Sequence, residues 1–156
     1  MGFLRFMKST GYALHGIAFL ARHNDGEPIQ LREIAGALGM PENYMAKIFQ
    51  TLSRAGLVNA SRGAHRGYRL VRPAEDISLL EVIELYEGPI DSIGCFLDEN
   101  SCAISDRCLF GGFWGGVKKE VRRRLEGATI QQFLKNWPAG NTEQPGDILI
   151  RKGLSP

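Results

Sequence analysis

The segment "PIQLREIAGALGMPENYMAKIFQTLSRAGLV", residues 28–58, decides the fold, because it holds two helical patterns joined by a tight turn. The apolar residues of the first pattern recur at the i, i+3, i+4 and i+7 spacing of one helix face, at Leu31, Ile34, Ala35 and Leu38. Gly39 follows, and glycine readily takes the left-handed conformation that ends a helix. Pro41 suits the first turn of a second helix.

The second helix of this segment has two contrasting faces. Its apolar face consists of Met45, Ile48, Phe49, Leu52 and Ala55. Its other face consists of Asn43, Ala46, Lys47, Gln50 and Arg54. That outer face contains no acid, although Glu42 stands at its edge. Any helix that packs on a core has an apolar stripe, but the short turn and the cationic outer face favour a helix-turn-helix.

The next segment, "LVNASRGAHRGYRLVRP" (57–73), predicts a β-hairpin directly after the second helix. Gly63 and Gly67 bracket the bend, and Pro73 ends the second strand. A hairpin in this place is the wing of a winged helix, and its cations are Arg62, His65 and Arg66 at the tip with Arg69 and Arg72 beyond. Such cations suit a narrow minor groove, whereas an ordinary solvated hairpin tip is the alternative.

Two further helical patterns follow the hairpin. "DISLLEVIELYEG" (76–88) predicts a short helix, with Ser78 as its cap and Glu81 three residues on. "FGGFWGGVKKEVRRRLEGATIQQFL" (110–134) predicts a long helix that Gly127 interrupts and Thr129 caps anew. The apolar stripe of the long helix, which we expect to face a partner chain, consists of Phe110, Phe113, Trp114, Val117, Val121 and Leu125. The predicted class is mainly α with a small β-hairpin: a winged helix-turn-helix plus a long dimerisation helix.

Charge is distributed unevenly along the 156 residues, which suffice for one domain. Residues 1–72 carry ten Lys/Arg and four Asp/Glu, whereas residues 73–156 carry nine and thirteen. A basic first half is expected of a nucleic-acid-binding surface. No stretch is long enough to span a membrane, so we expect a cytoplasmic protein. No nucleophile–base arrangement or phosphate-binding loop indicates an enzyme.

All three cysteines lie in the polar stretch "CFLDENSCAISDRC", residues 95–108. In a reducing compartment, clustered thiols more often serve as metal ligands or redox sensors than as structural disulfides. Zinc sites usually have a tighter first pair of cysteines than the six and five intervening residues found here. An iron–sulfur cluster, a zinc site, a thiol–disulfide switch and chance clustering therefore all stay open.

Taken together, five ordered motifs resemble the Rrf-type bacterial winged-helix transcription regulators, which include the IscR-like, NsrR-like and RirA-like iron–sulfur regulators. The motifs are "LRFMKSTGYAL" (4–14), "LREIAGALGMPENYMAKIFQTLSRAGLV" (31–58), "SRGAHRGYRLVRPAEDISLLEVIELYEGP" (61–89), the three cysteines, and "FW" (113–114). The resemblance implies a homodimer that binds a double-stranded DNA operator with two-fold symmetry. We expect a winged helix-turn-helix region at 1–76, a linker helix, cysteine loop and dimerisation helix at 77–135, and a flexible tail at 136–156.

The resemblance also implies roles for individual residues. Arg62 would enter the minor groove, and Tyr44 and Lys47 would contact the major groove or its phosphates. The remaining expected DNA-binding residues are Lys8, Ser9, Thr10, Asn43, Gln50, Arg54 and Arg66. Two positions depart from the family: Arg66-Gly67 replaces Gly-Gly before the wing tyrosine, and Ala46 replaces an acidic base-reading residue. The operator therefore need not match those of IscR-like relatives.

By the same resemblance, Cys95, Cys102 and Cys108 would hold an iron–sulfur cluster, with [4Fe-4S] favoured over [2Fe-2S]. Such a cluster normally has four protein ligands, and the fourth is unknown. The family's other ligand positions fall on Gly11 and Gly111. The alternatives are an open, labile iron, an exogenous ligand, or one of Asp98, Glu99, Asp106, His15, His23 and His65. An electron-transfer or cluster-carrier protein is the rival of another class, but a basic winged helix is not needed for that role. A winged helix that binds protein in place of DNA is a further alternative.

Overall fold

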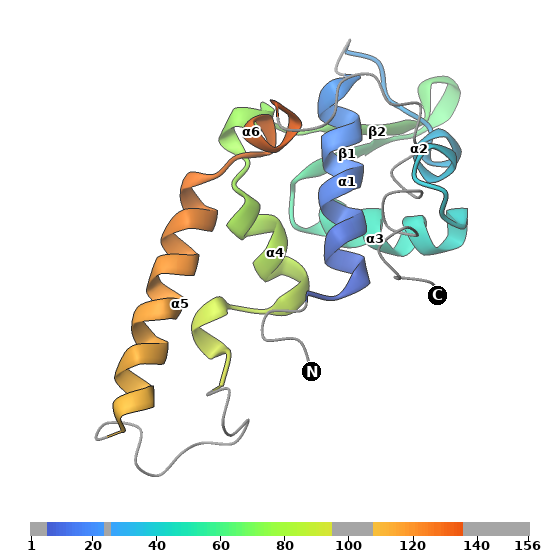
Figure 1. Ribbon diagram of the computed structural model, residues 1–156. Coiled ribbons are helices and arrows are strands. Elements are labelled where there is room, and N and C mark those ends of the chain that lie inside the picture. The colour runs from blue at the N-terminus through green and yellow to red at the C-terminus, as the bar shows by residue number, and fades with distance from the viewer. Residues whose placement is uncertain (1–5, 24–25, 95–107, 136–156) are drawn as a thin grey trace.

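The computed structural model describes residues 6–23, 26–94 and 108–135, so Cys95, Cys102 and the tail from residue 136 lie outside the described residues. The described chain is mainly helical, with one two-stranded antiparallel sheet (Figure 1). In chain order the elements are α1 (Lys8–Arg22), α2 (Leu31–Ala37), α3 (Glu42–Arg54), β1 (Val58–Ser61), η1 (Gly63–His65), β2 (Gly67–Leu70), η2 (Ala74–Asp76), α4 (Leu79–Glu87), η3 (Ile90–Ser92), α5 (Leu109–Gly127) and α6 (Ile130–Lys135).

Helices α2 and α3 form the predicted helix-turn-helix. Gly39 has a φ of 63° in the turn between them, which confirms the left-handed residue expected there. The apolar face of α3 is buried through Met45, Ile48, Phe49 and Leu52, as the period of 3.6 residues predicted. Ala55, which we had placed on that face, is instead exposed, because the helix has already ended at Arg54.

The predicted wing is confirmed as an antiparallel hairpin in which Val58 pairs with Leu70 and Ser61 pairs with Gly67. The hairpin is anchored to the segment before α2, because Ile29 and Tyr68 exchange two backbone hydrogen bonds of 2.9 and 2.8 Å. Tyr68 also packs edge-on against Phe49 of α3, with ring centroids 4.8 Å apart. These contacts fix the wing relative to the helix-turn-helix.

The anchor of the wing requires glycine at position 67. A Cβ at Gly67 would lie 2.7 Å from the carbonyl oxygen of Ile29, and that backbone cannot move without breaking the bridge. We expect Gly67→Ala to lower the free energy of unfolding by about 1–3 kcal/mol, as measured by urea denaturation. Gly36→Ala is the matched control, because a Cβ there meets nothing within 4 Å and α2 should gain about 0.5–1 kcal/mol. Equal stability of the two variants would contradict the predicted clash.

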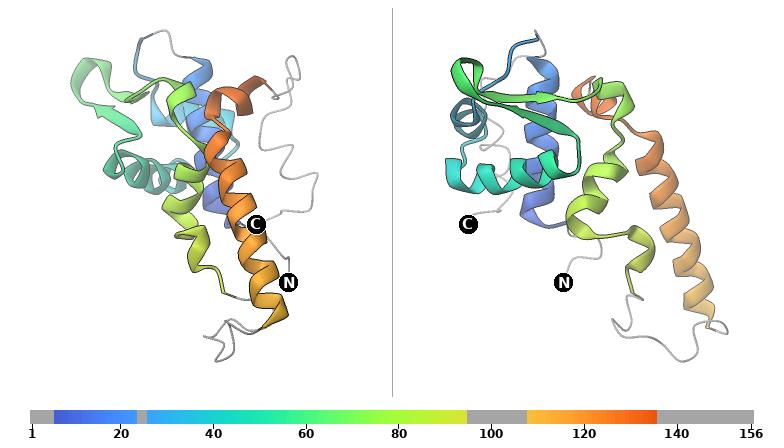
Figure 2. Two further views of the ribbon diagram at one scale, coloured as in Figure 1. Left: turned by 90° about the vertical axis from the view of Figure 1, so that its left-hand side faces the viewer. Right: turned by 180° about the vertical axis from the view of Figure 1, so that it is seen from behind.

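The C-terminal helices divide into one that returns to the core and one that extends away from it. Ile130 of α6 is fully buried in the same core cluster as Phe49 and Ile77, and Thr129 forms a β-bridge with Ser78. The predicted interruption after Gly127 is confirmed, because Gln132 donates its backbone N–H to Thr129 Oγ1 at 3.3 Å. Helix α5 instead runs alongside α4 and projects beyond the winged core (Figures 1 and 2).

The short helix predicted over residues 76–88 is α4, which spans only Leu79–Glu87. Ser78 caps it by accepting a hydrogen bond of 3.1 Å from the backbone N–H of Glu81. The Glu81 carboxylate forms an ion pair with Arg72, so Arg72 stabilises the junction between the wing and α4. Within the described ranges, no helix is both long enough and apolar enough to cross a membrane.

Candidate nucleic-acid interface and cysteine segment

The outward face of α3 presents the polar residues that the sequence indicated. Asn43, Lys47, Gln50 and Arg54 are all exposed, while Ala46 is half-buried between them. Tyr44 is half-buried, and its ring packs edge-on against Tyr12 of α1 at 5.9 Å, so it offers only part of its surface. The expected major-groove residues therefore occupy one cationic, solvent-facing strip.

The wing adds a second group of exposed cations. Arg62, His65 and Arg66 are exposed at the tip, where residues 63–65 form a single 3₁₀ turn. His65 lies 3.6 Å from Glu27, which precedes α2. The tip of the wing and α3 lie on the same side of the molecule, away from α5 (Figure 1). This arrangement allows both elements to contact one ligand surface.

The N-terminus of α1 is tied to the end of α4. Glu87 accepts hydrogen bonds from the backbone N–H of Met7, at 2.6 Å, and from the hydroxyl of Thr10. Thr10 is fully buried, so its hydroxyl is committed inside the protein, contrary to the expectation that it faces DNA. Lys8 is exposed and Ser9 is half-buried, so these two lie closer to solvent.

Three hydrogen bonds hold the residues before the cysteine segment against α5. The indole N–H of Trp114 donates to the carbonyl oxygen of Gly94 at 2.7 Å, and Trp114 is only 5% exposed. Lys118 Nζ donates to the carbonyl oxygens of Asp91 and Ile93 at 3.0 and 3.2 Å. Trp114 thus packs within its own chain, whereas we had assigned it to a stripe that faces a partner.

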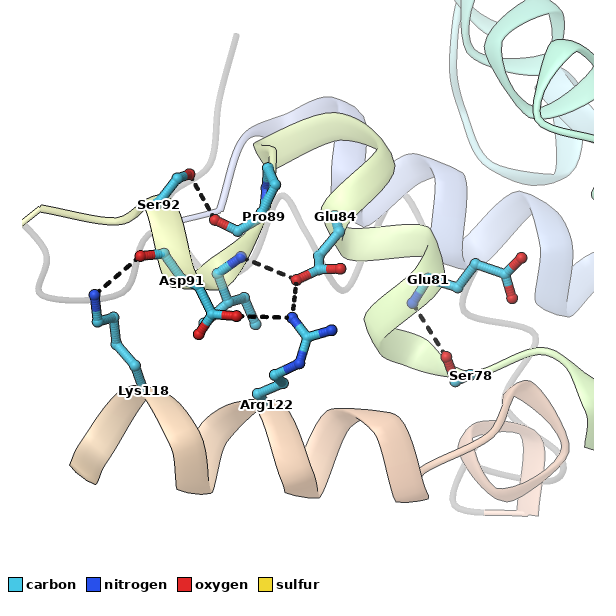
Figure 3. Close-up of polar contacts among 9 residues, drawn as sticks. Ser78, Glu81, Glu84, Pro89, Asp91, Ser92, Lys118 and Arg122 are labelled. Carbon is cyan, nitrogen blue, oxygen red and sulfur yellow. Dashed lines mark hydrogen bonds and ion pairs between the residues drawn. The ribbon is translucent and has the colours of Figure 1, made fainter. Parts of the chain in front are cut away.

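A partly exposed ion cluster reinforces this attachment (Figure 3). Arg122 of α5 bonds to Glu84 of α4 at 2.8 Å and to Asp91 of η3 at 3.2 Å. Glu84 also accepts the backbone N–H of Ile90 at 3.0 Å, which closes the cluster. Because one guanidinium joins three elements, α4, η3 and α5 are held together directly before the cysteine segment.

The two ends of the cysteine segment meet at the same end of α5. Cys108 is the residue before α5 and is a free, half-buried thiol. Trp114, which holds Gly94, lies six residues further along the helix, a rise of about 9 Å. Three cysteines are donors of the kind that iron–sulfur clusters take, and the described residues on either side of the segment, Gly94 and Cys108, both lie toward one end of α5. Among the described residues, no group of three or more His, Cys, Asp or Glu side chains is arranged to hold a metal.

The three histidines are placed away from Cys108 within the chain. His15 is largely buried and its ring lies 5.9 Å from that of Phe133 in α6; burial lowers its pKa, so it is neutral at pH 7. His23 follows the C-terminal end of α1 and bonds to the carbonyl oxygen of Phe19 at 2.9 Å. His65 is in the wing, at the far end of the molecule from the start of α5 (Figure 1).

Sequence reasoning did not identify the internal contacts of five side chains: those of Glu84, Trp114, Lys118 and Arg122 beside the cysteine segment, and that of Glu87 at the start of α1. Lys118 and Arg122 are one helical turn apart on the non-apolar side of α5, which was the one available signal. Their acceptors are 25 to 38 residues away in sequence, and no local pattern identifies them.

A winged helix-turn-helix with a cationic α3 face and wing defines the class of DNA-binding regulators. A sequence model of the Rrf2 family, described as iron-dependent transcriptional regulators, matches residues 6–136, and the chain belongs to this family. It is therefore a transcription regulator and not an enzyme.

Three similar proteins illustrate the relationship. Protein aau3 of Rhizobium meliloti is 35% identical over 88% of this chain and 90% of its own length. The structure of CymR, the global cysteine regulator of B. subtilis, has a TM-score of 0.72 at 26% identity, covering 86% of this chain and 99% of that one. The structure of T. potens IscR has a TM-score of 0.68 at 27% identity, covering 91% and 94%. The chain is thus an IscR-like regulator in sequence and in fold.

Proposed function

We propose that this chain is an operator-binding transcription regulator whose cysteine segment holds an iron–sulfur cluster, and that the state of the cluster modulates DNA affinity. The observation that carries the proposal is the hydrogen-bonded attachment of Gly94 to Trp114, which brings both ends of a three-thiol segment to one end of α5. The description of the family as iron-dependent supports the same assignment.

Three thiolates of this segment, from Cys95, Cys102 and Cys108, would hold the cluster, with [4Fe-4S] favoured over [2Fe-2S]. When bound, such a cluster supplies a centre that responds to redox change, nitric oxide or iron supply. The fourth position would be taken by a carboxylate of the segment or an exogenous molecule, or one iron would stay open, since the three histidines lie in α1, directly after α1, and in the wing. Trp114 bonds to Gly94, the residue before Cys95, and Lys118 and Arg122 both bond to Asp91.

The DNA-binding surface would consist of α3 and the wing. Lys47 and Tyr44 face the major groove or its phosphates, and Arg62 enters the minor groove. A homodimer joined through the projecting part of α5 would present two such surfaces to an operator with two-fold symmetry. The proposed regions are 1–76 for DNA binding and 77–135 for sensing and dimerisation, although α6 packs on the first of them.

The coupling between the cysteine segment and DNA binding would follow the contacts of α4. Arg122 joins α5 to Glu84 at the middle of α4, and Glu87 at its end bonds to the start of α1. A ligand can shift DNA affinity only as far as it favours one of two arrangements of these elements. The elements therefore have to differ in position between the two states of the segment.

The proposal is tested on protein purified without oxygen. We expect iron and sulfide in stoichiometric amounts with a coloured absorption spectrum, and loss of all three in Cys108→Ala. The DNA probe is the duplex recovered by selection from a random pool. Its Kd should differ about tenfold or more, or about 1.4 kcal/mol, between cluster-loaded and cluster-free protein. Cys108→Ala is the matched control, since its Kd should not respond to reconstitution. Equal affinities of the two forms would contradict the switch.

A thiol-based switch is the second candidate, and the similarity to CymR, a cysteine regulator, favours it. Two of the three thiols would form a disulfide and alter DNA affinity without a metal. Iron-free protein whose Kd for the selected duplex follows the dithiothreitol-to-disulfide ratio would support this candidate. Stoichiometric zinc would instead indicate a zinc site, and stable cluster binding without duplex binding would indicate a cluster carrier.

A further inference from the structure

A polar hollow lies where the start of α2, the start of α3 and the two strands of the wing meet. Its volume is about 260 Å³, and its polar lining consists of Gln30, Arg32, Glu42, Ser61 and Arg66. Tyr68 also lines the hollow, and its backbone is bonded to Ile29, so the hollow adjoins the fixed junction between wing and helices.

The lining is cationic on balance, because it includes two arginines and one glutamate. Arg32 and Arg66 are both exposed, and neither has an ion-pair partner among the side chains that the structure describes. Ser61 and Gln30 add neutral hydrogen-bond donors at the same rim. Forked guanidinium groups with neutral donors beside them match the oxygens of a phosphate.

The position of the hollow indicates that this phosphate belongs to the backbone of bound DNA. With α3 in a major groove and the wing in the adjacent minor groove, the sugar–phosphate strand that separates the two grooves has to pass between α3 and the wing. The hollow opens between these same elements, since Glu42 is the first residue of α3 and Ser61 is the last residue of β1.

We propose that this hollow receives a backbone phosphate of the bound duplex and that Arg32, from the first helix of the helix-turn-helix, is its principal contact. Arg66 is the second contact, which gives a role to the residue that replaces a glycine of the family pattern. Glu42 repels the same phosphate and limits affinity. The inference rests on the proposed DNA-binding function. It adds a phosphate contact, which would position the protein on the duplex without recognising the base sequence.

The test compares two fluorescent duplexes, the selected one and one of mixed sequence, by anisotropy titration over a range of salt concentrations. Arg32→Gln should raise the Kd of both duplexes by the same factor, about tenfold. It should also reduce the slope of log Kd against log salt by about one for each half-site bound. Glu42→Gln should shift Kd in the opposite direction, by a few-fold on both duplexes.

Lys135→Gln is the matched control, because it removes one exposed positive charge from α6, on the other side of α1 from α2 (Figure 1). If Arg32→Gln and Lys135→Gln give the same Kd and salt slope, the contact does not exist. Millimolar inorganic phosphate at constant ionic strength should weaken duplex binding by wild type more than by Arg32→Gln, because the two phosphates compete for the hollow. An equal effect on the two proteins would contradict the assignment. Failure of wild type to bind either duplex would instead refute the proposed function itself.

Discussion

Phe49→Ala should destabilise the protein more than any other single truncation in the described core. We expect a loss of about 3–5 kcal/mol in the free energy of unfolding, a large fraction of the roughly 5–15 kcal/mol of a typical domain. Phe49 is fully buried, packs edge-on against Tyr68 of the wing, and lies where α3 crosses α1 at Gly16. Its removal leaves a cavity that three elements share.

The measurement is urea denaturation followed by circular dichroism at one protomer concentration, because oligomers make stability concentration-dependent. A double-mutant cycle provides the control. A Cβ at Gly16 would lie 2.8 Å from Phe49 Cε2, so Gly16→Ala should destabilise the wild type by overpacking. The same change should cost much less in the Phe49→Ala background, where the ring is gone. Additive effects of the two substitutions would contradict the contact.

Phe113→Glu should dissociate the proposed homodimer. Phe113 is 59% exposed on α5, although the neighbouring Trp114 is buried against its own chain. If α5 pairs with its copy, a carboxylate at position 113 would be desolvated without a partner, at a cost of several kcal/mol. The dimer Kd should rise at least about 100-fold, as measured by sedimentation velocity across a dilution series.

Lys119→Glu introduces the same side chain on the same helix, but off the apolar stripe, and should leave the dimer intact. Affinity for the selected duplex should fall with dimerisation in Phe113→Glu only, because two linked surfaces bind cooperatively to two half-sites. A monomeric wild type, or a Phe113→Glu variant that sediments as the wild type does, would show that α5 is not the dimer contact.

Local pattern was sufficient for the elements that form the DNA-binding surface. The 3.6-residue period from Met45 to Leu52 correctly predicted which face of α3 is buried. It therefore also predicted that Lys47 and Gln50, on the opposite face, are exposed. Gly39 and Gly127 marked the helix ends. Glycine readily adopts the left-handed conformation and weakens a helix, and neither property depends on distant residues. Cationic residues on both sides of Gly63 likewise indicated the wing.

Local pattern was insufficient wherever a partner comes from a distant part of the chain. The sequence predicted that Thr10 binds DNA, but Glu87, 77 residues later, accepts a hydrogen bond from its hydroxyl. The sequence placed Trp114 on an apolar stripe that would face a partner chain, but its indole N–H donates a hydrogen bond to Gly94 of its own chain. Arg66 departs from the family pattern in sequence, and only the fold shows that it lines the same hollow as Arg32.

By itself, the sequence determined the helices, the wing and the grouping of three thiols, because residue spacing along a helix or hairpin dictates which side chains share a face. Only the tertiary structure decided which polar groups form hydrogen bonds within the protein and which stay exposed to a ligand. Pairing of this kind depends on distances between segments far apart in the chain, and one-dimensional periodicity contains no information about those distances.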